Sequence, residues 1–281
     1  MKDDAAANSP YELIIRPTST ISSRDLVDVW RYRELLWTLA SRDVRVRYKQ
    51  AAFGIAWALI QPLIQVVVFT ALFHRVAGIR GEASMPYPVF VASGVVIWGL
   101  FSTGLASASN SLVENARVIT KVYFPRVVLP LASILVATVD FAIGLAILLV
   151  LLLVYGVPIH ASILLVPVFA GLAALCALSL GLWTSALNIQ FRDVRYALPF
   201  FLQLMIFITP VFYPADLVPP PYRDLLVLNP MGAFVEGFRA AIFGTEIPWL
   251  NVATATGITL VTAFGGFLFF RRMEQSFADR A

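Results

Sequence analysis

The sequence has few charged residues for its length. Only 14% of its 281 residues are Asp, Glu, Lys or Arg, whereas 59% are hydrophobic, and the mean hydropathy is +0.80. A soluble domain carries about a quarter charged residues, because a folded chain needs a polar surface. This deficit excludes an ordinary soluble protein and indicates an integral membrane protein.

Other scarcities exclude particular kinds of site. The single cysteine, Cys176, leaves no intrachain disulfide and is interpreted as a small buried hydrophobe. No G-x-x-x-x-G-K-[ST] loop is present, so the chain does not bind ATP by that device. His74 and His160 stand apart as interfacial residues, and the predicted cytoplasmic loops lack clustered carboxylates. We therefore expect a chain that is not an enzyme and that holds no metal and no cofactor of its own.

Long uncharged stretches predict membrane spans. About 20 apolar residues cross a bilayer as an α-helix, the form that pairs its backbone groups internally. Six such helices are predicted near residues 53–76, 88–110, 128–154, 163–187, 197–214 and 250–270. The expected fold is an all-α integral membrane protein with a transmembrane domain over 53–272, between an N-terminal tail over 1–23 and a C-terminal tail over 273–281.

The distribution of Lys and Arg predicts the orientation. Six spans put both termini on one side, and 17 of the 21 basic residues fall on that side. The four others are Arg75, Arg80, Arg223 and Arg239. Because basic residues concentrate in cytoplasmic loops, both termini are expected in the cytoplasm.

An amphipathic helix is predicted before the first span, over 24–48 within a segment 24–52. At helical spacing one sector of about 120° collects its apolar side chains: Leu26, Val29, Trp30, Leu36, Trp37, Ala40 and Val44. Arg33 and Arg47 interrupt this sector. The helix is interpreted as a headgroup-layer anchor with interfacial Trp30 and Trp37, or as a segment that partly lines a gate.

The segment between the last two spans, 215–249, alternates proline breaks with short apolar pieces. Pieces of 10–14 residues suit re-entrant or interfacial helices better than crossings. One helix is expected to begin near Pro230 and to end at Gly244, since glycine favours the position just past a helix end.

Asp140 is an acid midway along the third predicted span. An intramembrane acid is costly unless it is paired, and it is a functional candidate for that reason. The competing interpretation is a structural partner for hydroxyls of the fourth span, such as Ser179 or Ser185.

Two cytoplasmic loops and one set of aromatic residues suggest contacts. The loops 111–126 and 188–196 carry apolar and aromatic side chains, including Tyr123 and Phe124, which we expect to be exposed for a partner groove, although both loops could simply reverse the chain. Aromatic residues near the outer span ends form an interfacial belt or stack on sugar rings: Phe69, Phe73, Phe90, Trp98, Phe101, Phe207, Phe212 and Tyr213.

Four stretches together resemble the permease subunits of type-2 ABC exporters, in the branch that exports O-antigen and teichoic acid. They are RDVRVRYKQAAFGIAWALIQPL, ITKVYFPRVVLPLASILVATVDF, SALNIQFRDVRYALPFFLQLMIFITPVFYP and LNPMGAFVEGFRAAIFG, within residues 24–272. The resemblance implies a homodimer in the cell inner membrane that works with two separate ATPase subunits. ATP and Mg²⁺ would be bound by those subunits and not by this chain.

The resemblance also assigns roles to segments. The helix 24–52 would be a cytoplasmic gate and 215–249 an outer gate, while 111–126 would be the coupling helix and 188–196 a second ATPase contact. The coupling candidates are Glu114, Asn115, Arg117, Ile119, Tyr123, Phe124, Arg192 and Asp193. The candidates for a substrate conduit, including aromatic residues suited to sugar rings, are Trp57, Gln61, Gln65, Phe69, Phe200, Gln203, Phe207, Phe212 and Tyr213.

The implied substrate is a lipid-linked polysaccharide, and it gives the basic cluster before the first span a second interpretation. Arg42, Arg45, Arg47 and Lys49 lie where a pyrophosphate headgroup would enter, and arginine suits phosphate oxygens. Positive-inside anchoring explains the same residues. An alternative cargo is a small amphiphile or drug. A membrane-embedded glycan enzyme or an ion-driven carrier is disfavoured by the missing carboxylate clusters.

Overall fold

A computed structural model describes residues 30–49, 55–76, 78, 85–122, 124–220 and 222–274. Throughout these ranges the regular structure is helical, and no strand occurs in them. This agrees with the predicted all-α fold. Side chains of residues 55–58, 224 and 225 lie outside the description. So do the predicted tail over 1–23 and residues 275–281 of the tail predicted over 273–281.

Within the described residues, five stretches of helix are long and apolar enough to cross a membrane. They are Leu59–Val76 within α3 (Ile55–Phe69) and the π-helix η1 (Thr70–Val76), α4 (Tyr87–Glu114), α6 (Val128–Val154), η2 (Ala161–Leu165) continued by α7 (Val166–Gln190), and α11 (Trp249–Glu274). Each coincides with a predicted span, and α6 matches its prediction at both ends.

The predicted span 197–214 corresponds to a shorter apolar helix, α8 (Val194–Ile208). Its predicted end at residue 214 is wrong. Proline disfavours helical backbone in the residue before it, and Thr209, which precedes Pro210, is extended with ψ of 135°. The chain therefore leaves the helix six residues early.

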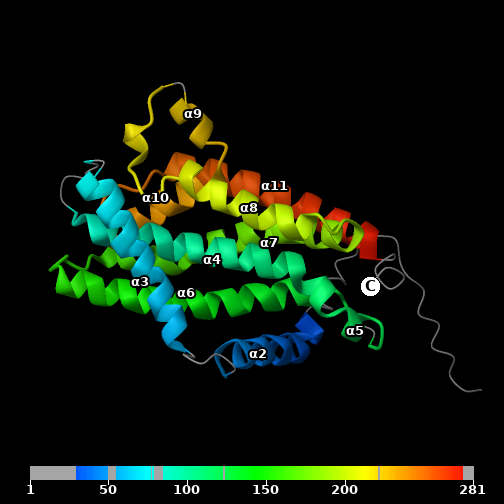
Figure 1. Cartoon of the computed structure of the whole chain (residues 1–281). Helices are drawn as coiled ribbons and strands as arrows, with labels where there is room; N and C mark the ends of the chain where they lie inside the picture. Colours follow the sequence, from blue (N-terminus) through cyan, green and yellow to red (C-terminus); the bar gives the residue numbers. More distant parts are fainter. Residues whose placement is uncertain are drawn as a thin grey trace, which may run out of the picture.

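Figure 1 shows α4, α6, α7, α8 and α11 running side by side, while α3 crosses them at a steep angle. The central element is α4, which packs most extensively on α7 and α6. Small residues allow the close approach: a Cβ added to Gly181 of α7 would lie 2.8 Å from the Ala108 Cβ of α4. The main core thus forms around α4, with α3 and α8 on its margin.

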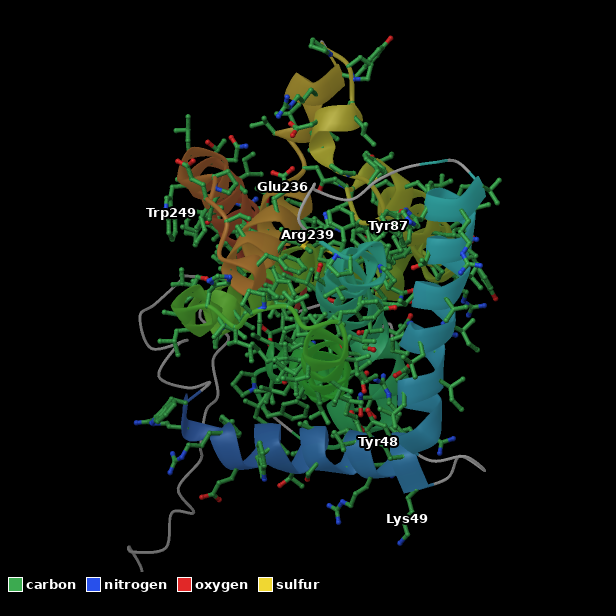
Figure 2. The ribbon with its side chains drawn as sticks, turned by 90° about the vertical axis from the view of Figure 1, so that its left-hand side faces the viewer. Tyr48, Lys49, Tyr87, Glu236, Arg239 and Trp249 are labelled. Carbon is green, nitrogen blue, oxygen red and sulfur yellow. The ribbon has the colours of Figure 1, made fainter. Side chains whose placement is uncertain are left out.

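The helix α2 (Arg33–Lys49) lies across the bundle and packs on α6 (Figures 1 and 2). Leu39 and Ala40 join a second apolar cluster with residues of α5 (Ala116–Ile119), α6 and α11. Trp30 and Trp37 are about 70% exposed, at 71% and 70%. The helix predicted over 24–48 is therefore confirmed from Arg33, and its first residues, 24–29, lie outside the described ranges.

After α8 the chain forms two helical turns and a buried helix. The turns η3 (Ala215–Leu217) and α9 (Tyr222–Leu226) project on the side opposite α2, whereas α10 (Pro230–Phe243) packs on α4, α7 and α11 (Figures 1 and 2). Asn229 caps α10 by accepting from the Met231 N–H at 3.2 Å, and Gly244 ends it at a φ of 71°. The predicted helix from Pro230 to Gly244 is confirmed.

One buried cation fixes the end of α8 to α4. Arg239 of α10 is 5% exposed, donates to the Pro210 carbonyl at 2.6 Å and to the Val211 carbonyl, and lies 3.7 Å from the Phe90 ring centroid. Gly94 makes room for it, since a Cβ there would meet the Arg239 Nη2 at 2.5 Å. Sequence reasoning counted Arg239 only as a loop charge and missed this role.

Candidate functional site

A cavity of about 470 Å³ lies where α3 crosses the bundle beside the end of α2. Its size falls within the range of about 300–1,000 Å³ found for ligand sites. Helix α3 contributes Gln61 and Gln65, and α4 contributes Trp98, Ser102, Thr103 and Ser107. The remaining polar lining comes from Arg47, Tyr48 and Asp140, beside the aromatic ring of Phe141. Two of the predicted conduit residues, Gln61 and Gln65, thus meet here.

Asp140 is paired with α2. Its carboxylate accepts hydrogen bonds from the Arg47 guanidinium and from the Tyr48 hydroxyl. The expected partners are wrong, because Ser179 and Ser185 donate to carbonyls of their own helix, at 2.8 and 3.2 Å. The end of α2 thereby supplies the countercharge that an acid midway along an apolar helix requires.

Tyr48 was missed by the sequence analysis, although it adjoins a candidate arginine. Burial, and then the hydrogen bond to the Asp140 carboxylate, raises the pKa of Tyr48 far above its usual range. The hydroxyl therefore stays protonated and remains a donor at every physiological pH. Asp140 is accordingly held by one cationic and one neutral donor from the same helix.

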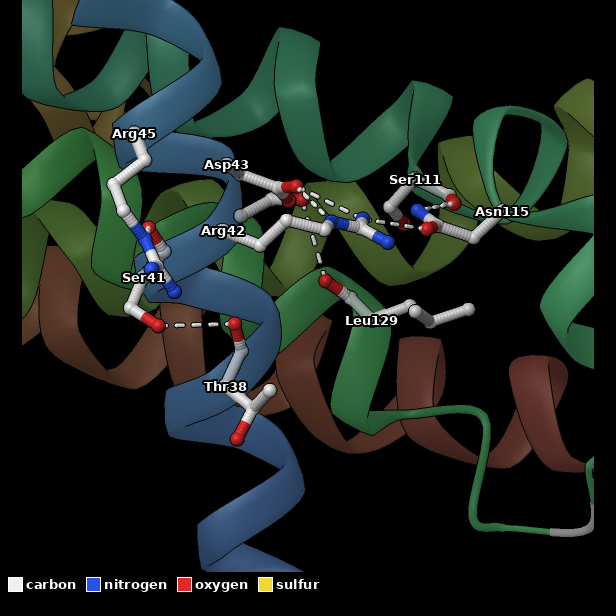
Figure 3. Close-up of polar contacts among 9 residues, drawn as sticks. Thr38, Ser41, Arg42, Asp43, Arg45, Ser111, Asn115 and Leu129 are labelled. Carbon is white, nitrogen blue, oxygen red and sulfur yellow. Dashed lines mark hydrogen bonds and ion pairs between the residues drawn. The ribbon is translucent and has the colours of Figure 1, made fainter. Parts of the chain in front are cut away.

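A second polar contact joins α2 to the junction of α4 and α5. The Arg42 Nη2 donates to the Asn115 Oδ1 at 2.8 Å, and the Arg42 Nε donates to the Asp43 Oδ1 at 2.8 Å (Figure 3). Asn115 in turn donates to the Ser111 carbonyl at 2.9 Å, from the break between the two helices back into α4. Arg42 thus connects α2 to the segment predicted to contact a partner.

The four basic candidates consequently differ. Arg42 and Arg47 bond to other helices, whereas Arg45 donates at 3.2 Å to the Ser41 carbonyl of its own helix. Lys49 is exposed and points away from the bundle (Figure 2). The sequence placed the four together, but the helical turn divides them between the bundle and solvent.

The other conduit candidates are spread over two further places. Phe200, Gln203 and Phe207 lie on the exposed side of α8, and the Trp57 side chain is outside the description. Phe69 and Phe212 stack with ring centroids 3.7 Å apart, with Phe73 of η1 and Phe207 nearby, and Phe212 is fully buried. The Tyr213 hydroxyl donates to the Phe207 carbonyl at 2.8 Å, near the end of α8.

The predicted coupling helix 111–126 is much shorter than expected. After α4 ends at Glu114, the described residues of this loop are helical only over the four residues of α5. The expectation that Phe124 is exposed is wrong: it is 4% exposed and packs with Ile119 in the cluster beneath α2. Burying both apolar side chains anchors the loop, while Glu114 and Arg117 face outward. Tyr123 lies outside the described residues.

The second predicted contact, 188–196, is a tight turn between α7 and α8. Its centre is Phe191–Asp193, where Phe191 is 53% exposed and Arg192 and Asp193 are also exposed. Tyr196, on the first turn of α8, is 77% exposed. This turn therefore presents exposed aromatic side chains, as expected of both loops, whereas Phe124 of the other loop is buried.

Within the described ranges no three His, Cys, Asp or Glu side chains lie close enough to share a metal ion. The arrangement there offers binding groups: a cation, an acid, amides, hydroxyls and aromatic rings around a cavity.

Comparison with known proteins connects this arrangement to transport. The chain is 27% identical over 256 residues to the O-antigen export system permease protein RfbA of Myxococcus xanthus, covering 90% of this chain and 97% of the relative. It is 25% identical over 250 residues to RfbA of Klebsiella pneumoniae, covering 88% and 94%. The polysialic acid transport protein KpsM of Escherichia coli is 24% identical over 241 residues, covering 84% and 92%. Residues 34–243 match the family described as ABC-2 type transporter, and because this match spans most of the chain, the protein belongs to that family of membrane permeases.

Proposed function

We propose that the chain is the permease subunit of an ATP-driven exporter that moves a lipid-linked polysaccharide from the cytoplasmic to the outer side of the cell membrane. The observation that carries this proposal is the similarity, over 84–90% of this chain, to relatives named for O-antigen and polysialic acid export. A match of this extent spans most of the chain and not one shared segment.

The cavity beside α2 supports a glycan-bearing cargo. Gln61, Gln65, Ser102 and Thr103 offer hydrogen-bonding groups of the kind that sugar hydroxyls need, and Trp98 offers an aromatic surface. A small apolar drug would not require so many polar groups. The cavity chemistry therefore favours a cargo rich in hydroxyl groups over a small apolar drug.

The ATP-hydrolysing partner is proposed to dock on two adjacent turns. Candidates at the α4–α5 junction are Glu114, Asn115 and Arg117, with Tyr123 beyond it, and candidates at the α7–α8 turn are Arg192 and Asp193. Phe191 and Tyr196 join the second set, because exposed aromatic side chains are enriched at protein interfaces. Two ATPase subunits would bind ATP and Mg²⁺ and move these turns.

A second copy of the chain is proposed to pack along α3 and α8. Both helices have exposed apolar faces, which include Ile64, Val67 and Phe200. In a membrane such faces contact lipid or another helix. A conduit between two copies would then be bordered by Phe200, Gln203 and Phe207, with Gln61 and Gln65 near its cytoplasmic entrance.

The proposed location is the cell inner membrane, with both termini, α2 and α5 toward the cytoplasm. The distribution of lysine and arginine supports this orientation. In it, α2 serves as a gate at the entrance, and the segment from η3 to α10 lies at the outer side, where it would form the second gate.

The test is to delete the chain and to locate the lipid-linked glycan in separated inner-membrane and surface fractions. Accumulation on the cytoplasmic side, reversed by the wild-type chain but not when the partner ATPase carries a hydrolysis-blocking substitution, supports the proposal. Normal glycan at the surface of cells that lack the chain, together with the loss of efflux of a small amphiphile, would mean that the chain exports the amphiphile and not the polysaccharide.

A further inference from the structure

The cavity beside α2 contains one cation and one acid that neutralise each other. Among the described residues that line it, Arg47 and Asp140 carry the only formal charges, and they form an ion pair. Their side chains are 40% and 24% exposed, respectively. The pair is thus accessible from the cavity, and any anion that enters can reach Arg47.

The guanidinium has more donors than the acid uses. Arginine carries five N–H donors in a planar fork, and Asp140 accepts from Nη1. A phosphate presents three or more oxygens and binds arginine bidentately. A phosphate group would therefore compete with Asp140 for Arg47 on favourable terms, whereas a neutral ligand would not.

The same acid holds α2 in place. Asp140 accepts from both Arg47 and Tyr48, two successive residues near the end of α2, and it lies midway along α6. Loss of the Arg47 contact would leave the Tyr48 hydroxyl as the one hydrogen bond to Asp140 from this end of α2, among the residues that the structure describes. Displacement of the Asp140 carboxylate from Arg47 by another anion would thereby weaken the attachment of α2 to α6.

We propose that Asp140 is a placeholder anion, which the phosphate head of a membrane-embedded amphiphile displaces from Arg47 when it enters the cavity, so that ligand binding releases the end of α2 from α6. The identity of that amphiphile as the lipid-linked diphosphate of a transported glycan rests on the proposed function. Bilayer phospholipid has the same phosphate chemistry and is the other source.

Direct binding tests the displacement. The full chain, purified as it assembles in detergent, is titrated with a polyprenyl diphosphate, with phosphatidylglycerol and with an uncharged polyprenol. Asp140→Asn removes the competing charge and keeps the shape. If Arg47 is free of Asp140 in about one-tenth of the wild-type molecules, this change makes the free state dominant, and the dissociation constant for the diphosphate should fall about tenfold. Arg47→Gln should raise it at least about tenfold, the loss of one charge-assisted contact.

Matched variants separate this from a structural role. Arg45→Gln removes an equal charge from the same helix, but the Arg45 side chain bonds within α2. This variant should therefore bind the diphosphate with the affinity of the wild type. Tyr48→Phe removes one contact to Asp140 without altering a charge, and it should also tighten binding, by a smaller factor. If Asp140→Asn does not fold, two other variants carry the test: Tyr48→Phe, and the double exchange of Arg47→Asp with Asp140→Arg. The double exchange keeps a cation in the cavity, and it should therefore still bind the diphosphate.

The outcomes are distinct. Binding of the diphosphate alone assigns the transported molecule, and equal binding of phosphatidylglycerol assigns bilayer lipid. The displacement is overturned if the uncharged polyprenol binds as tightly as the diphosphate. It is also overturned if both Asp140→Asn and Tyr48→Phe bind the diphosphate no more tightly than the wild type. Normal surface glycan in cells that lack the chain, while the binding pattern holds, would refute the proposed function alone. Loss of export in those cells, while the Asp140→Asn and Tyr48→Phe variants bind the diphosphate like the wild type, would refute the displacement alone.

Discussion

Arg42 of α2 and Asn115 at the junction of α4 and α5 are joined by a 2.8 Å hydrogen bond, although 73 residues separate them in the chain. Asn115 also bonds back to α4 through the Ser111 carbonyl. The helix that borders the cavity is therefore connected to a turn that faces outward at the end of the bundle. A motion imposed on that turn has a direct polar route to α2.

The first prediction concerns this connection. Asn115→Ala removes the acceptor for Arg42, and we expect glycan export to fall several-fold while the complex still hydrolyses ATP, because the drive no longer reaches α2. Arg42→Gln should behave alike. The measurement is the ratio of glycan exported to ATP hydrolysed in vesicles that contain the whole complex.

Arg45→Gln is the matched control, since Arg45 bonds within its own helix. A parallel loss of hydrolysis and export in Asn115→Ala would instead mean that the ATPase no longer docks, and it would contradict a transmitting role for the Arg42–Asn115 bond.

A second prediction concerns the buried Arg239. Arg239→Ala leaves the Pro210 and Val211 carbonyls without their donor, and an unsatisfied buried polar group costs about 1–3 kcal/mol. We expect the free energy of unfolding to fall by about 2–4 kcal/mol, measured by denaturation in detergent. Arg239→Lys should recover only part, because an ammonium group cannot fork to both carbonyls.

The exposed Arg223 provides the comparison. It pairs with Asp216 near α9, both side chains being largely exposed, and such pairs contribute about 0–1 kcal/mol. Arg223→Ala should therefore melt like the wild type. Equal effects of the two alanine substitutions would show that Arg239 does not hold the end of α8.

Sequence reasoning succeeded where the cause is local. The apolar run of α6 predicted Val128–Val154 at both ends, and the proline and glycine around α10 predicted its bounds. Hydrophobic length and backbone preferences act within a few residues, so they can be read from the chain.

It failed where the cause is a contact between distant segments. Asp140 was compared only with the neighbouring span, whereas its partners Arg47 and Tyr48 precede the first span by sequence and reach α6 because α2 lies across it. Phe124 was expected to be exposed for a partner groove, yet it is buried in an apolar cluster with residues of α2 and α11. An aromatic residue in a loop does not by itself indicate which side it faces.

A third prediction uses two glycines of the same helix. A Cβ at Gly181 would lie 2.8 Å from the Ala108 Cβ, whereas a Cβ at Gly171 meets nothing within 4 Å. Gly171→Ala should stabilise α7 slightly, by up to about 1 kcal/mol, because alanine is the better helix former. Gly181→Ala should destabilise the protein by about 1–3 kcal/mol, because it forces α4 and α7 apart. Thermal denaturation of both variants in one detergent makes the comparison, and an unchanged melting temperature in Gly181→Ala would mean that the two helices separate freely.

The last prediction separates docking from folding at the proposed ATPase surface. Phe191 and Tyr196 are exposed on the α7–α8 turn, whereas Phe124 is buried beneath α2. Phe191→Ala and Tyr196→Ala should keep the melting temperature of the isolated chain and weaken its binding to the ATPase, since a central aromatic contact contributes about 2 kcal/mol or more. Phe124→Ala should do the reverse, with a loss of about 3–5 kcal/mol of stability from the cavity it leaves. The measurements are denaturation of the chain alone and co-purification with the ATPase across a concentration series. If Phe124→Ala weakened binding while the chain melted normally, the buried loop and not the α7–α8 turn would be the docking surface, since only a side chain that reaches the partner can change affinity without changing the fold.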